Sequence, residues 1–398
     1  MDEKRILTDQ ERLNWLKLSR TSQIGPITFN QLIQKFKSPT SALDYISAHS
    51  NEPKYKNFVI PSSGIIEKEI EQLNKIGGRF IAQIEPDYPY LLSTILDAPP
   101  LISVLGNISL YQKPTISIVG SRNASSNGRK IAENIASELS QGGYTIISGL
   151  ARGIDTAAHE GSLAYGTIAV VAGGLNSFYP LENQQLQKSI GQQGLLISET
   201  PLGLQPQARH FPRRNRLISG LSLGILIVEA TFQSGSLTTA RFGLEQGREI
   251  MAIPGSPLDP RCHGTNNLIK NGAQLVENAQ DILTYLQSIA FSLYNNQSNF
   301  LPTIPKKEDK IDNKDFNLNT GRHLNDSHNK HIETLLSTTP ISIDDLHHQS
   351  QLSIDVLNMV LSEMELAGKI ERHPGNRISK VFNLKDNKLI YQYTKETL

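Results

Sequence analysis

Six short apolar segments alternate with longer, helix-like segments between residues 115 and 255, and this rhythm limits the possible folds more than any other feature of the chain. Each apolar segment is a continuous run rich in Ile, Val and Leu. Such strands are buried on both faces, as in a parallel sheet covered by helices on both sides. The sequence therefore predicts a doubly wound α/β domain. The expected strands are ISIVG, YTIISG, TIAVVAGG, GLLISET, GILIVEA and EIMAIPG.

The segments on either side of this domain have different compositions. The N-terminal part predicts short helices, with Thr8 as a helix cap and a Gly25-Pro26 turn that resembles helix-hairpin-helix and sterile-alpha-motif modules. Such modules bind the DNA backbone or other proteins, although a simple helical packing domain is the favoured interpretation. The expected parts are a helical domain at 1–68, the α/β domain at 69–288, a polar linker at 289–330 and a winged-helix-like domain at 331–398.

The winged-helix-like domain carries little positive charge where a duplex would bind. Its third helix is expected from Ser353 to Leu366 and would face the groove of a bound duplex. This helix contains Asp355, Glu363 and Glu365 but no Lys or Arg. A protein contact is therefore at least as well supported as a duplex contact, and a duplex-binding regulator is only a third interpretation.

Composition excludes several classes of protein. The chain has 398 residues, a formal net charge of +1 and 38% hydrophobic residues, so any acidic partner must meet local patches of charge. Its one cysteine, Cys262, excludes an internal disulfide framework and a cysteine-rich zinc site. The charged N-terminus lacks the apolar core of a signal peptide, and no apolar run reaches the length of a membrane span. We expect a cytoplasmic protein without a membrane contact.

The first expected strand ends in Gly-Ser-Arg, and a polar loop and a helix follow it. Free N–H groups and the helix dipole make such a turn a site for an anion. The loop lacks the full G-x-G-x-x-G pattern and the downstream acid of a nicotinamide site. It also lacks the G-x-x-x-x-G-K-[ST] pattern of P-loop hydrolases. The sequence therefore predicts a phosphate-bearing ligand of another kind.

Arginines and aromatic residues gather in the loops that follow the strands. Cations spread over several loops suit a polyanion, and aromatic rings beside them can stack on the bases of a single strand. SGSLTTA after the fifth strand predicts a further anion-binding turn. Asp155 and His159 share a helix face, where local ion pairing or loop support is favoured over catalysis. The arginines are Arg122, Arg152, Arg209, Arg213, Arg214 and Arg216, and the aromatic residues are Phe178, Tyr179 and Phe211.

Seven motifs in order resemble the DNA-processing protein A family, also called Smf, over about residues 79–283. They are IVGSRNAS, SGLARGIDTAAHEGSL, VVAGGLNSFYPLEN, LLISETPLG, FPRRNRLISGLS, IVEATFQSGSLTTAR and AIPG. The resemblance implies a Rossmann-like core and a single-stranded-DNA-binding protein. It also implies that the protein protects incoming DNA in natural transformation and loads the RecA recombinase onto it. Hydrolytic chemistry is not implied, and we expect no catalytic residue, cofactor or metal.

The resemblance and the strand ends together supply the candidate site. Leu181 occupies a position where many relatives would carry a basic residue, so Lys188 is a possible substitute. The candidate nucleic-acid contacts are Gly120, Ser121, Arg122, Gly149, Arg152, Gly173, Gly174, Tyr179, Asn183, Lys188, Phe211, Arg213, Arg214, Asn215, Arg216, Ser234, Gly235 and Ser236.

Two further interpretations remain open. The resemblance implies a homodimer through the late part of the α/β domain, where Leu268, Ile269 and Leu275 are the apolar candidates, although core packing explains them equally well. The alternative function is that of a nucleotide-binding Rossmann-like enzyme that resembles the nucleoside monophosphate phosphoribohydrolases. Those enzymes use a glutamate near a PGG-x-GT turn, and Glu229 and Glu245 lie near a turn of different sequence here.

Overall fold

The computed structural model describes residues 4–294 and, with short gaps, residues 328–381. The chain divides into two units at residue 304. Most of the linker expected at 289–330 lies outside the described residues.

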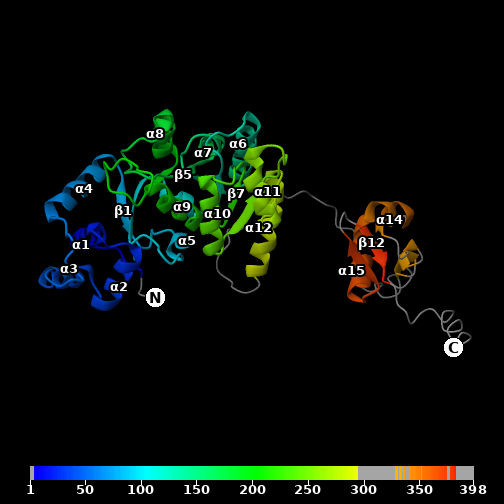
Figure 1. Cartoon of the computed structure of the whole chain (residues 1–398), viewed down its shortest axis with the longest axis horizontal. Coiled ribbons are helices and arrows are strands. Elements are labelled where there is room, and N and C mark those ends of the chain that lie inside the picture. The colour runs from blue at the N-terminus through cyan, green and yellow to red at the C-terminus, as the bar shows by residue number, and fades with distance from the viewer. Residues whose placement is uncertain are drawn as a thin grey trace, which may run out of the picture. The chain divides into compact units, whose positions relative to one another are not determined.

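Residues 4–294 contain a nine-stranded mixed sheet (Figure 1). Its order is β1-β2-β6-β5-β4-β3-β7-β8-β9, and β3 to β9 pair in parallel whereas β1 and β2 add two antiparallel strands at one edge. The six expected strands are confirmed as β3 to β8. The strands are β1 (Arg79–Ala82), β2 (Leu101–Gly106), β3 (Thr115–Val119), β4 (Thr145–Ser148), β5 (Thr167–Val170), β6 (Leu195–Ser198), β7 (Gly224–Ile227), β8 (Glu249–Ala252) and β9 (Gln274–Leu275).

Helices cover both faces of this sheet, which confirms the doubly wound fold. Alternate residues of one strand enter different cores, because successive side chains point to opposite faces. In β3, Ile116 and Ile118 pack against α6, α7 and α12, whereas Val119 belongs to the core with α5, α9 and α10. The helices are α5 (Tyr90–Ser93), α6 (Ser126–Gln141), α7 (Ile154–Ser162), α8 (Gln184–Gln193), α9 (His210–Gly220), α10 (Gly235–Glu245), α11 (His263–Lys270) and α12 (Ala279–Tyr294).

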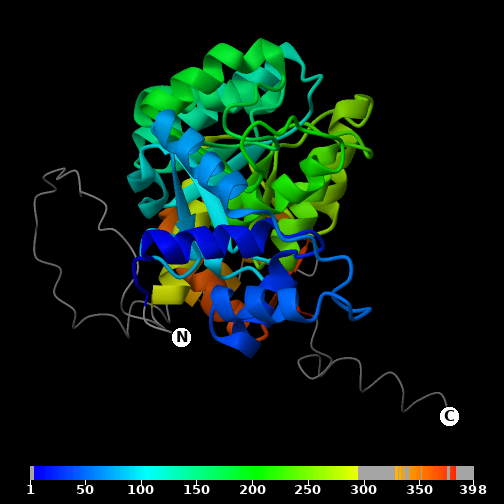
Figure 2. The same cartoon turned by 90° about the vertical axis from the view of Figure 1, so that its left-hand side faces the viewer.

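Four N-terminal helices pack onto the antiparallel edge of the sheet. Thr8 forms a capping box with Glu11 at the start of the first helix, and Gly25 caps the second, as expected. Trp15 Nε1 donates to the carbonyl oxygen of Pro100 over 2.8 Å, and Arg12 pairs with the buried Glu85. Figures 1 and 2 show these helices gathered at one end of the first unit. They are α1 (Asp9–Arg20), α2 (Pro26–Phe36), α3 (Pro39–Ala48) and α4 (Ser63–Lys75).

The expected domain boundaries at residues 68 and 288 both fall inside helices. Helix α4 runs from Ser63 to Lys75, and α12 continues to Tyr294. One apolar core also joins Phe29 and Ile66 of the N-terminal helices to Leu101 and Leu196 of the sheet. The N-terminal helices therefore belong to the same compact unit as the sheet.

The second unit has the predicted winged-helix arrangement. Its described part contains α14 (Ile343–Ser350) and α15 (Ile354–Leu366) beside β10 (Ile341–Ser342), β11 (Ile370–His373) and β12 (Arg377–Lys380). Three strands of this part form a sheet in the order β10-β12-β11. On α15, Glu365 pairs with Arg372 over 2.9 Å.

Among the described residues, no helix combines the length and apolarity that a membrane crossing requires.

Candidate nucleic-acid interface

A cavity of about 240 Å³ opens where β3, β4 and β5 end. The cavity lies close to the position between β3 and β7 where the order of successive strands changes direction in the sheet. Ligands of open α/β sheets bind at such positions. The residues of the candidate list that line it are Arg122, Gly149, Arg152, Gly173, Tyr179, Phe211 and Arg214. The residues that the sequence did not single out are Asn123, Ala151, Val171, Ala172, Ser177, Pro180 and Pro206.

The missed residues carried little signal in the sequence. Ala151, Val171 and Ala172 lie at or just after expected strand ends, where a small or apolar residue predicts core packing rather than ligand contact. Ser177 and Pro206 are brought to the cavity by two long loops. A search of all residues within a few positions of each strand end would have found Asn123 and Ala151.

Arginine and two aromatic rings form one wall of the cavity. The guanidinium carbon of Arg122 lies 5.0 Å from the centre of the Phe211 ring. The rings of Tyr179 and Phe211 have their centres 5.3 Å apart at an angle of 56°. Tyr179 is 44% exposed, so its ring remains accessible to a ligand. This wall can hold a phosphate and a planar group side by side.

Arg214 lies beneath this wall and is buried. Its Nη1 donates to the carbonyl oxygen of Val170 over 2.7 Å and to that of Gly149, and its Nε donates to Asn215 over 3.1 Å. Burial lowers the pKa of Arg214 to about 10, while the neighbouring Asp155 opposes this shift. Arg214 therefore stays charged at neutral pH and brings a fixed positive charge to the cavity.

The loop after β4 is held by Asp155. The Asp155 carboxylate accepts the N–H of Gly149 over 3.1 Å and that of Ala151 over 3.3 Å. Burial raises the pKa of Asp155, and the positive charge of Arg214 works against that shift. Loop support, the favoured role for Asp155, agrees with this geometry. A Cβ on Gly149 would overlap the Arg214 guanidinium, which explains the glycine.

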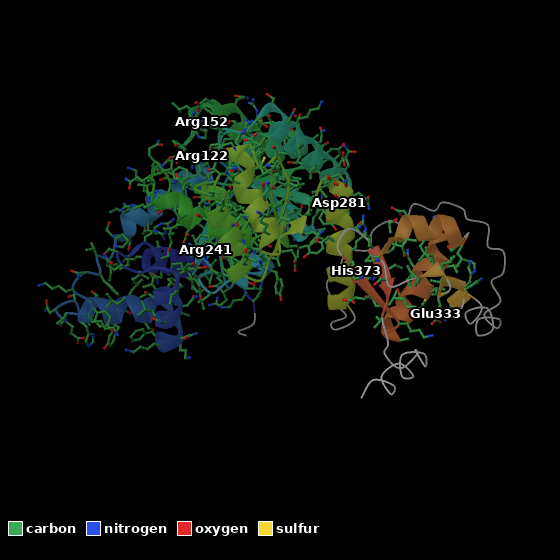
Figure 3. All side chains as sticks on the ribbon, turned by 45° about the vertical axis from the view of Figure 1, so that its right-hand side comes forward. Arg122, Arg152, Arg241, Asp281, Glu333 and His373 are labelled. Atoms are coloured by element: carbon green, nitrogen blue, oxygen red, sulfur yellow. The ribbon has the colours of Figure 1, made fainter. Side chains whose placement is uncertain are left out.

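Arg152 is an exposed cation in the lining of the cavity. Its side chain is 60% exposed, and its nearest carboxylate partner, Glu182, lies 3.8 Å away. Figure 3 labels Arg122 and Arg152 close together in the view and Arg241 apart from them. Arg152 is therefore free to turn toward a ligand at the rim.

The expected anion site at the start of α6 is already filled by the protein itself. The carboxylate of Glu229 accepts the N–H of Ser125 over 2.9 Å and its hydroxyl over 2.5 Å. A Cβ on Gly128 in the first turn would lie 2.5 Å from this carboxylate. An internal carboxylate therefore occupies the start of this helix, and the predicted phosphate at this helix end stays a prediction that would have to compete with Glu229.

The glycine and serine of the Gly-Ser-Arg turn shape the loop instead. A Cβ on Gly120 would lie 2.6 Å from Cγ1 of Ile154. Ser121 is buried, its hydroxyl accepts the N–H of Asn123 over 3.1 Å, and its carbonyl accepts the N–H of Ile154. Neither residue lines the cavity, so their contribution is to position Arg122 and Asn123.

Arg216 does not reach the cavity, although it is two residues from Arg214. Its guanidinium pairs with Glu199 over 2.5 Å and with Asp97 over 3.4 Å, and its side chain is only 6% exposed. Residues two apart on a helix face opposite sides, so α9 cannot direct both arginines into one cavity. Arg216 therefore serves an internal ion pair in this structure, and its contact with DNA stays a prediction without a place in the cavity.

The remaining candidates lie outside the cavity for separate reasons. Asn183 is buried, and its amide donates to the carbonyl oxygen of Leu150 over 2.9 Å. Lys188 lies 5.7 Å from the ring centre of Phe178. Gly174 packs against the loop after β6, and Asn215 donates to the carbonyl oxygen of Gly235. The other candidates outside the cavity are Arg213, Ser234, Gly235 and Ser236.

The two glutamates that a nucleotide hydrolase could use, Glu229 and Glu245, make other contacts. Glu229 caps α6, and Glu245 lies on the exposed surface of α10, 3.8 Å from Arg241. Neither lines the cavity. Among the described residues there is also no cluster of His, Cys, Asp and Glu that could hold a metal ion.

The structure is that of a doubly wound α/β protein with a cavity lined by arginines and aromatic rings at its strand ends, preceded in the chain by a helical part and followed by a winged helix. Family comparison agrees with each part. The family model described as "DNA recombination-mediator protein A" matches residues 79–287. The model of the winged-helix domain of DprA matches residues 325–376, and the model of the DprA-like N-terminal helical domain matches residues 9–71. The chain belongs to the DNA recombination-mediator protein A family.

Individual relatives support this assignment. The chain is 30% identical to Protein Smf of Synechocystis over 94% of its length and 100% of that protein. It is 47% identical to DNA processing protein DprA of Streptococcus pneumoniae over 49% of its length and 70% of that protein. The solved structure of the Streptococcus pneumoniae protein is 33% identical, with a TM-score of 0.59, and the match covers 70% of this chain and 98% of that one.

Proposed function

We propose that the cavity binds single-stranded DNA. The observation that carries this proposal is the meeting of Arg122, Arg214 and the Tyr179–Phe211 ring pair in one cavity at the strand ends. Arginines hold the phosphates of a single strand, and aromatic faces stack on its bases, at about 1–3 kcal/mol per base.

The size of the cavity favours a single strand over a duplex. Its volume of about 240 Å³ is on the scale of one nucleotide rather than of a duplex, and Tyr179 and Phe211 line it. A base in a duplex is stacked and paired, and removing it from the stack costs a few kcal/mol. A strand with unpaired bases reaches Tyr179 and Phe211 without that cost.

Family membership supports a proposal for the biological role. We propose that the protein protects incoming single-stranded DNA in natural transformation and loads RecA onto it. The description of the family as recombination mediators supports this role. A mediator must hold the strand while leaving part of it accessible to the recombinase. A binding site confined to the ends of the strands β3, β4 and β5 allows this.

We also propose that the protein forms a homodimer through β9. Leu275 lies on this edge strand and is 43% exposed, so it can meet a second copy. Leu268 and Ile269 of α11 instead pack partly against the core of the sheet. Of the three candidates, Leu275 is therefore the best placed for a contact between subunits.

The test of the binding proposal compares single- and double-stranded DNA of equal length in a mobility-shift assay at two salt concentrations. We expect the single strand to bind at least about tenfold more tightly, a difference of about 1.4 kcal/mol. Affinity should fall as salt rises, because phosphate contacts release counterions. Equal affinity for both forms would contradict the proposal. Release of free base from AMP would support the nucleotide-hydrolase alternative.

A further inference from the structure

A second cavity, of about 290 Å³, lies beside the first. It is bounded by the end of α1, the turn before α2, the loop after β6 and helix α9. Val171 and Arg214 line both cavities. The two cavities are therefore neighbours that share Val171 and Arg214 in their lining.

The second cavity is lined by three arginines and one carboxylate, namely Arg20, Arg213, Arg214 and Glu199. Arg20 is neutralised by Glu69, with a distance of 2.9 Å between Nη2 and Oε1. Glu199 is neutralised by Arg216. Arg213 remains, with its side chain 62% exposed and its nearest carboxylate 3.8 Å away. Together with Arg214, it makes this cavity suitable for an anion.

Arg214 is the buried group that faces both cavities. Its residue is only 6% exposed, and its hydrogen bonds use Nε and Nη1. Among the described residues, no acceptor is found for Nη2. Nη2 of Arg214 is also not one of the fully buried polar atoms that lack a partner, so it remains available to donate to a phosphate oxygen at the lining that the two cavities share.

The start of α2 also lines the second cavity and offers additional donors. Gly25 and Pro26 line it, and no side chain caps this helix end. The free N–H groups of the first turn of an 11-residue helix favour an anion. A Cβ on Gly25 would meet nothing within 4 Å, so space remains in front of this helix end.

We propose that the second cavity binds the next phosphate of the same DNA strand, between Arg213, Arg214 and the start of α2. This inference rests on the proposed function, because it extends the path of the strand from the first cavity. Arg214 then contacts two consecutive segments of the backbone. The N-terminal helices become part of the DNA-binding surface, in addition to packing on the sheet.

The test replaces Gly25 with an acid and with its neutral isostere. Asp and Asn are equally good helix caps, so both variants should fold, and thermal melting checks this. Gly25→Asp places a negative charge where the phosphate would lie. We expect it to lower affinity for an oligothymidine of about 12 nucleotides, within the usual site sizes, by roughly fivefold or more. Gly25→Asn should change affinity less than about twofold, since it adds no charge.

Two further variants separate the possible outcomes. Arg213→Ala should weaken binding and flatten the salt slope by about 0.7, whereas Arg241→Ala on the exposed surface of α10 should do neither. Equal losses for Gly25→Asp and Gly25→Asn, or wild-type binding by both Gly25→Asp and Arg213→Ala, would overturn the second site. If Arg122→Ala lowers the affinity for single-stranded DNA in the same assay, the proposed function stands even when the second site is overturned. If the wild-type protein binds no single strand, the proposed function itself fails.

Discussion

The carboxylate of Glu229 accepts both the N–H and the hydroxyl of Ser125, at 2.9 and 2.5 Å, and so occupies the start of α6. The two residues are 104 positions apart in the chain. The contact ties the loop after β7 to the loop after β3, on either side of the reversal in the sheet. It also places a carboxylate at the helix start, while Arg122 lines the neighbouring cavity.

Removing this internal anion should expose the helix end. We expect Glu229→Ala to lower the free energy of unfolding by about 1–3 kcal/mol, because the N–H of Ser125 loses its acceptor. Sulfate should then stabilise the variant more than it stabilises the wild-type protein, since it can replace the carboxylate at the start of α6. Urea unfolding with sulfate or chloride measures both effects. Equal stabilisation of the two proteins by sulfate would contradict this account.

Arg122 should supply a phosphate contact without supporting the fold. We expect Arg122→Ala to weaken single-stranded DNA binding at least several-fold and to reduce the salt slope by about 0.7. Its melting temperature should stay close to that of the wild-type protein. Arg241→Ala is the matched control, because it removes an exposed arginine away from the cavity. Unchanged binding by Arg122→Ala at low and physiological salt would make a small nucleotide the leading ligand.

Arg216 should behave in the opposite way. Arg216→Ala leaves Glu199 without its main partner in a largely buried place. We expect the free energy of unfolding to fall by about 3 kcal/mol, because an unpaired buried charge is costly. Urea unfolding measures this loss. A variant that keeps full stability but loses DNA binding would show that Arg216 contacts the strand.

His159 should make stability depend on pH. Burial, aided by Arg214, lowers the pKa of His159 to about 3, far below its usual value near 6.5. Below pH 6.5 the unfolded chain binds a proton at this residue and the folded chain does not, so stability is lost as the pH falls. We expect the wild-type protein to lose about 2 kcal/mol more than His159→Gln between pH 7 and pH 5. Parallel pH profiles of the two proteins in urea unfolding would contradict this expectation.

The two leucines near the proposed dimer contact should respond differently to charge. Leu275→Glu should remain folded and shift the protein to a monomer in light scattering, because Leu275 is exposed on the edge strand β9. Leu268→Glu should instead lower the melting temperature, because Leu268 packs against the core. If Leu275→Glu leaves the mass unchanged, the subunits do not meet at β9.

Local sequence patterns determined the strands of the parallel sheet and two of the helix starts in this protein. Continuous apolar runs specify β3 to β8, because a strand buried on both faces leaves no room for polar alternation. Thr8 and the Gly25-Pro26 turn specify two helix starts, because caps act within three or four residues. The same local patterns placed arginines and aromatic residues at the strand ends, where the cavity lies.

Tertiary structure alone decided which of those residues share a site. Arg214 and Arg216 look alike in the sequence, but the position of α9 against the sheet directs one to the cavity and the other to Glu199. The start of α6 looks like a site for an external phosphate until Glu229, from a distant loop, is seen to fill it. The physical reason is that an ionic or hydrogen-bonding group takes whichever partner the fold brings within about 3 Å, and that partner can lie anywhere in the chain.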